Sequence, residues 1–120
     1  MRNHVELGRR GEDLAAEYLE ASGYEILDRN WHCRWGEIDL VAARDGALVC
    51  VEVKTRSSVL AGHPLDAITD EKLQRMRRVA GAWRRGHPDA RGRLQLDVIA
   101  ILIRPDGLVD FSHLQAIGLQ

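Results

Sequence analysis

Asp39, Glu52 and Lys54 are the residues of this sequence whose types and spacing could do chemistry. They stand in two apolar stretches on either side of Asp45-Gly46, a dipeptide typical of the two-residue turn of a β-hairpin. Counting outward from such a turn places Asp39 directly opposite Glu52, with Cβ atoms about 5 Å apart, where like charges destabilise a sheet. A divalent cation between the two carboxylates would relieve that repulsion, and oxygen ligands suit Mg²⁺ or Mn²⁺. Lys54 points to the same side and could hold a phosphate beside the ion.

The same count divides the hairpin into a polar face and an apolar face. The polar face carries Glu37, Asp39, Cys50, Glu52 and Lys54, and the apolar face carries Ile38, Leu40, Val49, Val51 and Val53. A plainer interpretation stays open, in which Glu37 pairs with Lys54 and Glu52 is a solvated surface acid. The spacing alone does not choose between a metal site and a polar surface.

Length and composition predict one globular domain over residues 1–120. Hydrophobic residues make up 45% of the chain, which favours a folded core over disorder. No apolar run approaches a membrane span, and the first residues lack the apolar region of a signal peptide, so we expect a cytoplasmic protein without membrane contact. Cys33 and Cys50 are then expected to be reduced thiols, since a zinc site with His32 would fit no familiar ligand spacing.

The charge of the chain is nearly balanced in total but unevenly distributed. The formal net charge is −1, whereas residues 71–93 contain eight Lys or Arg against two acids. A neutral total argues against a protein that coats nucleic acid indiscriminately, but a local basic patch is what a phosphate-binding surface requires. A charged face in contact with solvent is the commoner explanation of such a segment.

The elements that must position these residues follow from hydrophobic periodicity and turn signals. We expect helices at about Val5–Ser22 and from Pro64 or Asp66 to Arg85, and strands at Tyr24–His32, on both sides of the Asp45-Gly46 turn, at Arg93–Arg104 and at Leu108–His113. The segment Arg29–Trp35 is expected to contain a turn region. The order α-β-β-β-α-β-β predicts an α/β fold with a mixed central sheet of about five strands flanked by helices. Because a helix joins them, the second hairpin strand and Arg93–Arg104 should be parallel.

Two further acids occupy unusual positions. Glu12 borders the apolar stripe of the first helix, where it is either an ordinary acid of the helix's N-terminal half or one that leans toward Asp39 and Glu52. Asp97 lies inside an apolar strand, and a buried acid needs a cationic or hydrogen-bonding partner. We expect a structural role for Asp97, because one strand acid by itself specifies no chemistry.

Four segments in this order, GRRGEDLAAEYLEASGY, NWHCRWGEIDLVA, VCVEVKTR and LQLDVIAI, resemble the YraN-like family of probable endonucleases, in the PD-(D/E)xK nuclease superfamily. The family is similar to Holliday junction resolvases, and the resemblance implies a restriction-endonuclease-like core. By position, Glu12 matches the helix acid, Asp39 the first strand acid, and Glu52 with Lys54 the acid-x-lysine signature. Ile38 replaces the proline that precedes the strand acid elsewhere in the superfamily, as is usual in this subfamily.

The resemblance implies metal-assisted hydrolysis of DNA phosphodiesters, including branched or junction DNA in repair or recombination. Asp39 and Glu52 would hold Mg²⁺ or Mn²⁺ with help from Glu12, and Lys54 would orient the attacking water or stabilise the phosphate. Candidates for contacts with nucleic acid are Trp35, Arg56, Lys72, Arg75 and Arg78. A homodimer would extend the binding surface. The alternative function is a catalytically silent module on a nuclease scaffold, which binds nucleic acid or another protein.

Overall fold

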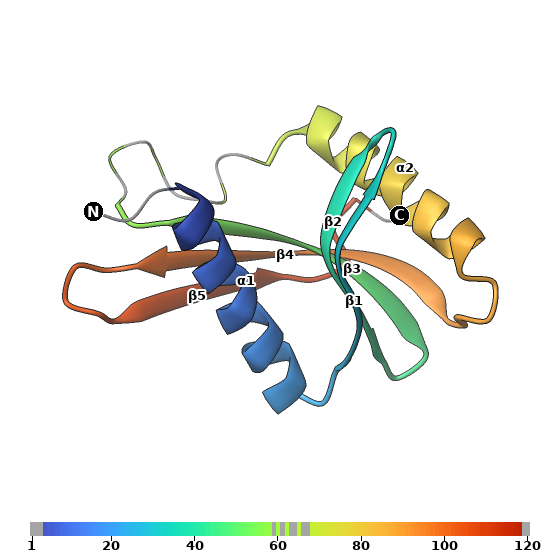
Figure 1. Ribbon diagram of the computed structural model, residues 1–120, viewed down its shortest axis with the longest axis horizontal. Helices are drawn as coiled ribbons and strands as arrows, with labels where there is room; N and C mark the ends of the chain where they lie inside the picture. Colours follow the sequence, from blue (N-terminus) through green and yellow to red (C-terminus); the bar gives the residue numbers. More distant parts are fainter. Residues whose placement is uncertain (1–3, 59, 61, 63–64, 66–67, 119–120) are drawn as a thin grey trace.

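A five-stranded mixed sheet between two helices forms the frame of the molecule (Figure 1). The computed structural model describes residues 4–58, 60, 62, 65 and 68–118. The elements are α1 (His4–Ala21), β1 (Glu25–Cys33), β2 (Gly36–Arg44), β3 (Ala47–Arg56), α2 (Asp70–Gly86), β4 (Arg93–Ile103) and β5 (Val109–Leu114). The strands lie in the order β1-β2-β3-β4-β5, and every neighbouring pair is antiparallel except β3 with β4. The predicted α/β class, element order and parallel pair are confirmed.

Each helix covers one face of the sheet and closes its own hydrophobic core. Helix α1 contributes Ala15 and Leu19 to a core that contains alternate residues of the three central strands. Helix α2 contributes Val79 and Trp83 to a core on the opposite face. Strand β4 supplies residues to both cores, as expected for the central apolar strand. No helix in the described part of the chain is long and apolar enough to cross a membrane.

Helix α2 begins later than the sequence pattern indicates. Its N-cap is Thr69, whose side chain accepts a hydrogen bond from the backbone N–H of Lys72 at 3.2 Å. A threonine cap satisfies one of the free N–H groups of the first turn, and this fixes the start at Asp70. The predicted starts, Pro64 and Asp66, lie outside the described residues.

The hairpin of β2 and β3 has the predicted two-residue turn. Its register runs from Arg44 opposite Ala47 to Leu40 opposite Val51. Asp45 and Gly46 both have positive φ, 48° and 78°, as the mirror-image turn of a two-residue hairpin requires. The paired register ends at Leu40, so the predicted pairs of Asp39 with Glu52 and of Glu37 with Lys54 lie beyond it.

The regular alternation of side chains between the two faces of the sheet breaks at Asn30 of β1 and Asp39 of β2. In β1, Asn30 has φ 52°, a conformation that asparagine tolerates better than most residues. The register of β1 with β2 places Asn30 opposite Asp39, between the pairs Arg29–Leu40 and Trp31–Ile38. Beyond this point both strands turn their side chains to the other face.

The structure corrects two sequence-based expectations about β1 and β2. Ile38 was predicted to share a face with Leu40, but it packs in the α2 core while Leu40 packs in the α1 core. Strict alternation of side chains fails because the strands are irregular at Asn30 and Asp39, so the residues before and after this pair do not keep the same faces. The segment Arg29–Trp35 is not a turn region in most of its length, since β1 continues to Cys33 and only two residues form the turn.

Candidate active site

Strand β3 presents Glu52 and Lys54 side by side at its carboxyl half. Lys54 Nζ lies 3.1 Å from Glu52 Oε1, and about a quarter or less of each side chain is exposed (22% and 25%). Glu37 instead forms an ion pair with His32, with 2.8 Å between Nε2 and Oε2. The plainer interpretation, in which Glu37 pairs with Lys54 and Glu52 is a free surface acid, is therefore wrong in both parts.

A cavity of about 290 Å³ opens between β3 and the N-terminal half of α2. Its lining residues are Gly36, Glu37, Glu52, Lys54, Lys72, Arg75, Met76 and Val79. The sequence contains two lysines, and both of them line this cavity. Three cations and two acids thus face one space, a combination that suits a ligand with negative oxygens such as a phosphate.

Helix α2 packs against the start of β2 at Gly36. Gly36 has φ 143°, in the region that favours glycine. A Cβ atom there would lie 3.4 Å from side-chain atoms of both Arg75 and Val79. The start of β2 and the middle of α2 therefore fix the width of the cavity beside Lys54.

The carboxylate of Asp39 turns into the gap between β2 and β3. Its Oδ2 accepts a hydrogen bond from the backbone N–H of Val53 at 2.7 Å. In the regular ladder that N–H would bond to the carbonyl of Ile38, so the side chain replaces a backbone acceptor where the paired register has ended. Asp39 lies next to Glu52 in this way without being a lining residue of the cavity.

The surroundings of Asp39 disfavour its charged form. Burial raises the pKa of Asp39 to about 7, the hydrogen bond from Val53 opposes the rise, and the charges of Glu12, Glu52 and Glu37 add to it. Helix α1, strand β2 and strand β3 thus each bring a carboxylate within electrostatic range of Asp39, which is itself partly desolvated. Such a group needs a proton or a cation beside it near neutral pH.

Helix α1 brings Glu12 to the same region from the opposite face of the sheet. At Gly11 the helix touches β3 so closely that a Cβ atom would lie 1.8 Å from Thr55 Oγ1. Burial raises the pKa of Glu12, the hydrogen bond from Asn30 and the charge of Arg29 lower it, and Glu37 raises it further. Glu12 therefore leans toward the sheet acids, the second of the two alternatives for this residue.

The donor chemistry of these acids fits a hard divalent cation. Carboxylate oxygens are the ligands that Mg²⁺ prefers, and one or two carboxylates are enough where substrate phosphate and water complete the shell. Within the described ranges, no three His, Cys, Asp or Glu side chains gather closely enough to hold one ion by themselves. Cys33 and Cys50 are free thiols, and burial raises the pKa of Cys50 to about 12.

The residues predicted to contact nucleic acid do not all lie together. Lys72 and Arg75 line the cavity, whereas Arg78 is exposed farther along α2. Trp35 is half-buried against the α2 core, and the guanidinium of Arg34 lies 4.8 Å from the centre of its ring. Arg56 ends β3 and donates a hydrogen bond to the carbonyl of Thr55.

Asp97 belongs to a buried network away from the cavity. It is fully buried, and its carboxylate receives the backbone N–H of Ala116 at 3.0 Å, Gln95 Nε2 at 2.9 Å and His113 Nε2 at 2.7 Å. The other ring nitrogen of His113 lies 2.8 Å from the hydroxyl of Tyr18 on α1. These partners match the structural role expected for Asp97, since they join β4, β5 and α1.

Two residues of the site were not identified from the sequence. Glu37 lines the cavity with Glu52, and its place two residues before Asp39 on the predicted polar face was the available signal. Asn30 bonds to Glu12 and lies opposite Asp39, but nothing in the local pattern distinguishes it from a turn residue.

Comparison with known proteins identifies the family. A model of the uncharacterised protein family UPF0102 matches residues 11–101, a range that contains all four candidate catalytic residues. The chain belongs to the UPF0102 family. A UPF0102 protein of Clavibacter michiganensis is 50% identical over 102 residues, covering 85% of this chain and 86% of the relative. One of Renibacterium salmoninarum is 46% identical over 118 residues, covering 98% and 100%. The YraN-like resemblance is thus confirmed as membership of UPF0102.

Proposed function

We propose that this UPF0102 protein is a cytoplasmic, metal-dependent endonuclease that hydrolyses DNA phosphodiesters, including those of branched or junction DNA. The observation that carries the proposal is the Glu52–Lys54 ion pair beside the half-buried Asp39, at a cavity that also receives Lys72 and Arg75. This arrangement supports membership of the PD-(D/E)xK superfamily, because the strand acid reaches β3 between the two residues of the acid-x-lysine signature.

Asp39 and Glu52 would hold Mg²⁺ or Mn²⁺, with Glu12 assisting directly or through a water. When bound, the metal lowers the pKa of a coordinated water and neutralises charge that develops on the attacked phosphate. Asp39 must release its proton for this, and its pKa of about 7 lets it do so at neutral pH. Because ionising Asp39 without a partner is costly, a cation bound beside it would stabilise its charged form strongly.

Lys54 supplies the fixed positive charge of the proposed site. Its ion pair with Glu52 holds Nζ at the cavity wall, where it can donate to a phosphate oxygen or orient the attacking water. Lys72 and Arg75 reach the same cavity from α2 and are placed to hold the phosphates that flank the reacting one. Cations from α2 and β3 beside acids from β2 and β3 suit an anionic substrate bound through a cation.

The test is cleavage of labelled branched, flapped and single-stranded DNA with Mg²⁺ or Mn²⁺. Glu52→Gln and Lys54→Ala should each lower the rate about 100-fold or more, as the loss of a group that stabilises the transition state does. Glu25→Gln, which removes an exposed acid from β1 of the same sheet, should leave the rate unchanged. Cleavage by both site variants at the wild-type rate would refute the residue assignment.

The two lysines give a direct measure of metal and substrate binding. With 13C-methylated lysine, Lys54 and Lys72 are the side chains observed by NMR, and both should shift when DNA is added. Binding of DNA with no cleavage of any substrate would favour the alternative, a silent binding module. Sedimentation with and without DNA tests the homodimer that a junction substrate would require.

A further inference from the structure

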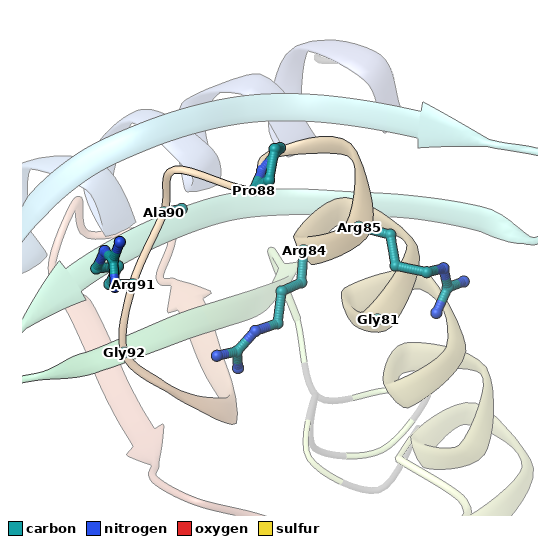
Figure 2. Close-up of a pocket in the computed structure, with 7 residues that line it drawn as sticks. All are labelled: Gly81, Arg84, Arg85, Pro88, Ala90, Arg91 and Gly92. Carbon is teal, nitrogen blue, oxygen red and sulfur yellow. The ribbon is translucent and has the colours of Figure 1, made fainter.

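A second basic cavity lies at the other end of α2 (Figure 2). It has a volume of about 690 Å³ and opens to solvent between the last turn of the helix and the loop that leads to β4. Its lining residues are Gly81, Arg84, Arg85, Pro88, Ala90, Arg91 and Gly92. In Figure 2 Arg84 and Arg85 leave the last turn in different directions, and Arg91 stands on the loop across from Arg84.

In the part of the chain that the structure describes, the three arginines of this cavity have no acidic partner. Other arginines do form ion pairs, namely Arg29 with Asp13, Arg44 with Asp45 and Arg104 with Asp106. Among the residues that the structure describes, no acid lies within ion-pair distance of Arg84, Arg85 or Arg91. The helix dipole favours cations in the last turn, which accounts for Arg84 and Arg85, but it does not account for Arg91 on the loop.

The loop that carries Arg91 is fixed against the β2–β3 turn. Arg93 N–H donates to the carbonyl of Gly46 at 2.8 Å, and Ala90 N–H donates to the carbonyl of His87 at 3.0 Å. Gly92 has φ 136°, and a Cβ atom there would lie 2.9 Å from the Gly46 oxygen. Because the loop is anchored on both sides of Arg91, binding a ligand there costs little ordering of the backbone.

A row of cations joins this cavity to the candidate active site. Arg75, Arg78 and Arg85 are separated by three and seven residues, spacings that place side chains on one flank of a helix. At 1.5 Å per residue, Arg75 and Arg85 lie about 15 Å apart along the axis of α2. That distance corresponds to about four to five base-pair steps at 3.4 Å per nucleotide of one strand.

We infer that the Arg84–Arg85–Arg91 cavity is a second phosphate-binding site, which holds the sugar–phosphate backbone of the nucleic acid whose scissile phosphate lies near Lys54. The inference rests on the proposed function for the identity of the ligand. Arginine guanidinium groups bind phosphate oxygens in pairs of parallel hydrogen bonds, and unpaired arginines lose no ion pair when they do so. The cavity contacts the backbone and therefore fixes the position of the duplex without reading its sequence.

The test compares two double variants with equal loss of charge. Arg84→Gln/Arg91→Gln removes two cations from the cavity. Arg44→Gln/Arg93→Gln removes two cations from a neighbouring cavity at the same end of the sheet. Tyr24, a residue of the α1 core, also lines that cavity. Binding of a fluorescent 20-base-pair duplex (about two helical turns) is measured by anisotropy in EDTA across a series of salt concentrations, so that no cleavage is involved.

The slope of log affinity against log salt should fall in magnitude by about 2 in Arg84→Gln/Arg91→Gln, since each phosphate contact contributes about 0.9. The slope should stay at the wild-type value in Arg44→Gln/Arg93→Gln. Equal slopes in all three proteins, or equal falls in both variants, would overturn this second site and leave the proposed nuclease site standing. No salt-dependent binding by the wild type would overturn both. Equal melting temperatures check that the variants fold.

Discussion

Replacing Asp39 by Asn should stabilise the protein, and the gain should grow with pH. The pKa of Asp39 rises from an ordinary 3.8 to about 7 on folding, so the folded state binds the proton more tightly than the unfolded state. Between these two pH values stability therefore falls as pH rises, and the full cost is present above pH 7. At about 1.4 kcal/mol per pKa unit, that cost is about 4 kcal/mol at pH 8 and roughly 2 kcal/mol at pH 5.

Asparagine removes the charge and keeps an oxygen that accepts the Val53 N–H. Urea unfolding of wild type and Asp39→Asn in EDTA, at pH 5 and at pH 8, measures the gain at each pH. Asp45→Asn is the control, because this exposed acid sits in a turn where asparagine is well tolerated, and it should change stability by less than about 0.5 kcal/mol at both pH values. A gain for Asp39→Asn that is the same at pH 5 and pH 8, or a loss at pH 8, would refute the reasoning.

Two further predictions concern the contacts that hold the site in place. Gly11→Ala should lower the free energy of unfolding by about 1–3 kcal/mol, because the added Cβ meets Thr55 Oγ1. Gly8→Ala, where no atom lies within 4 Å of the added Cβ, should raise it by about 0.5–1 kcal/mol. Urea unfolding of both variants measures these changes. His113→Ala should cost roughly 3 kcal/mol by removing the one ionisable partner of the buried Asp97 carboxylate within the described residues, and much less in an Asp97→Asn background. A double-mutant cycle measures that difference, and additive effects would contradict the pairing.

Much of the fold could be predicted because its signals are local. The Asp45-Gly46 turn fixes the register of β2 with β3 as far as Leu40, since a two-residue turn determines which residues of the two strands lie opposite each other. The break at Asn30 could not be predicted, because a positive φ at a single asparagine carries no periodic signal. Ile38 was assigned to the wrong face for that reason.

The candidate site was predictable in its parts and not in its assembly. Glu52 and Lys54 share a strand, so their two-residue spacing was enough to place them together. Lys72 and Arg75 reach the same cavity because α2 crosses between parallel strands, a contact that depends on the whole topology. The raised pKa of Asp39 likewise depends on its burial in the folded chain and, after that, on acids from three separate elements.

The parallel pairing of β3 with β4 also constrains the order in which the molecule can fold. Strands β1, β2 and β3 pair through short connections, whereas β4 can join β3 only after segment 57–92 has closed into a loop. Loop closure is an entropic barrier that precedes any reward from the contacts. We expect Φ-values to be high at Leu40 and Val51 and low at Ile99, and the reverse pattern from stopped-flow measurements would refute this order. A chain emerging from the ribosome would then form the Glu52–Lys54 pair before α2 docks and brings Lys72 and Arg75 to the cavity.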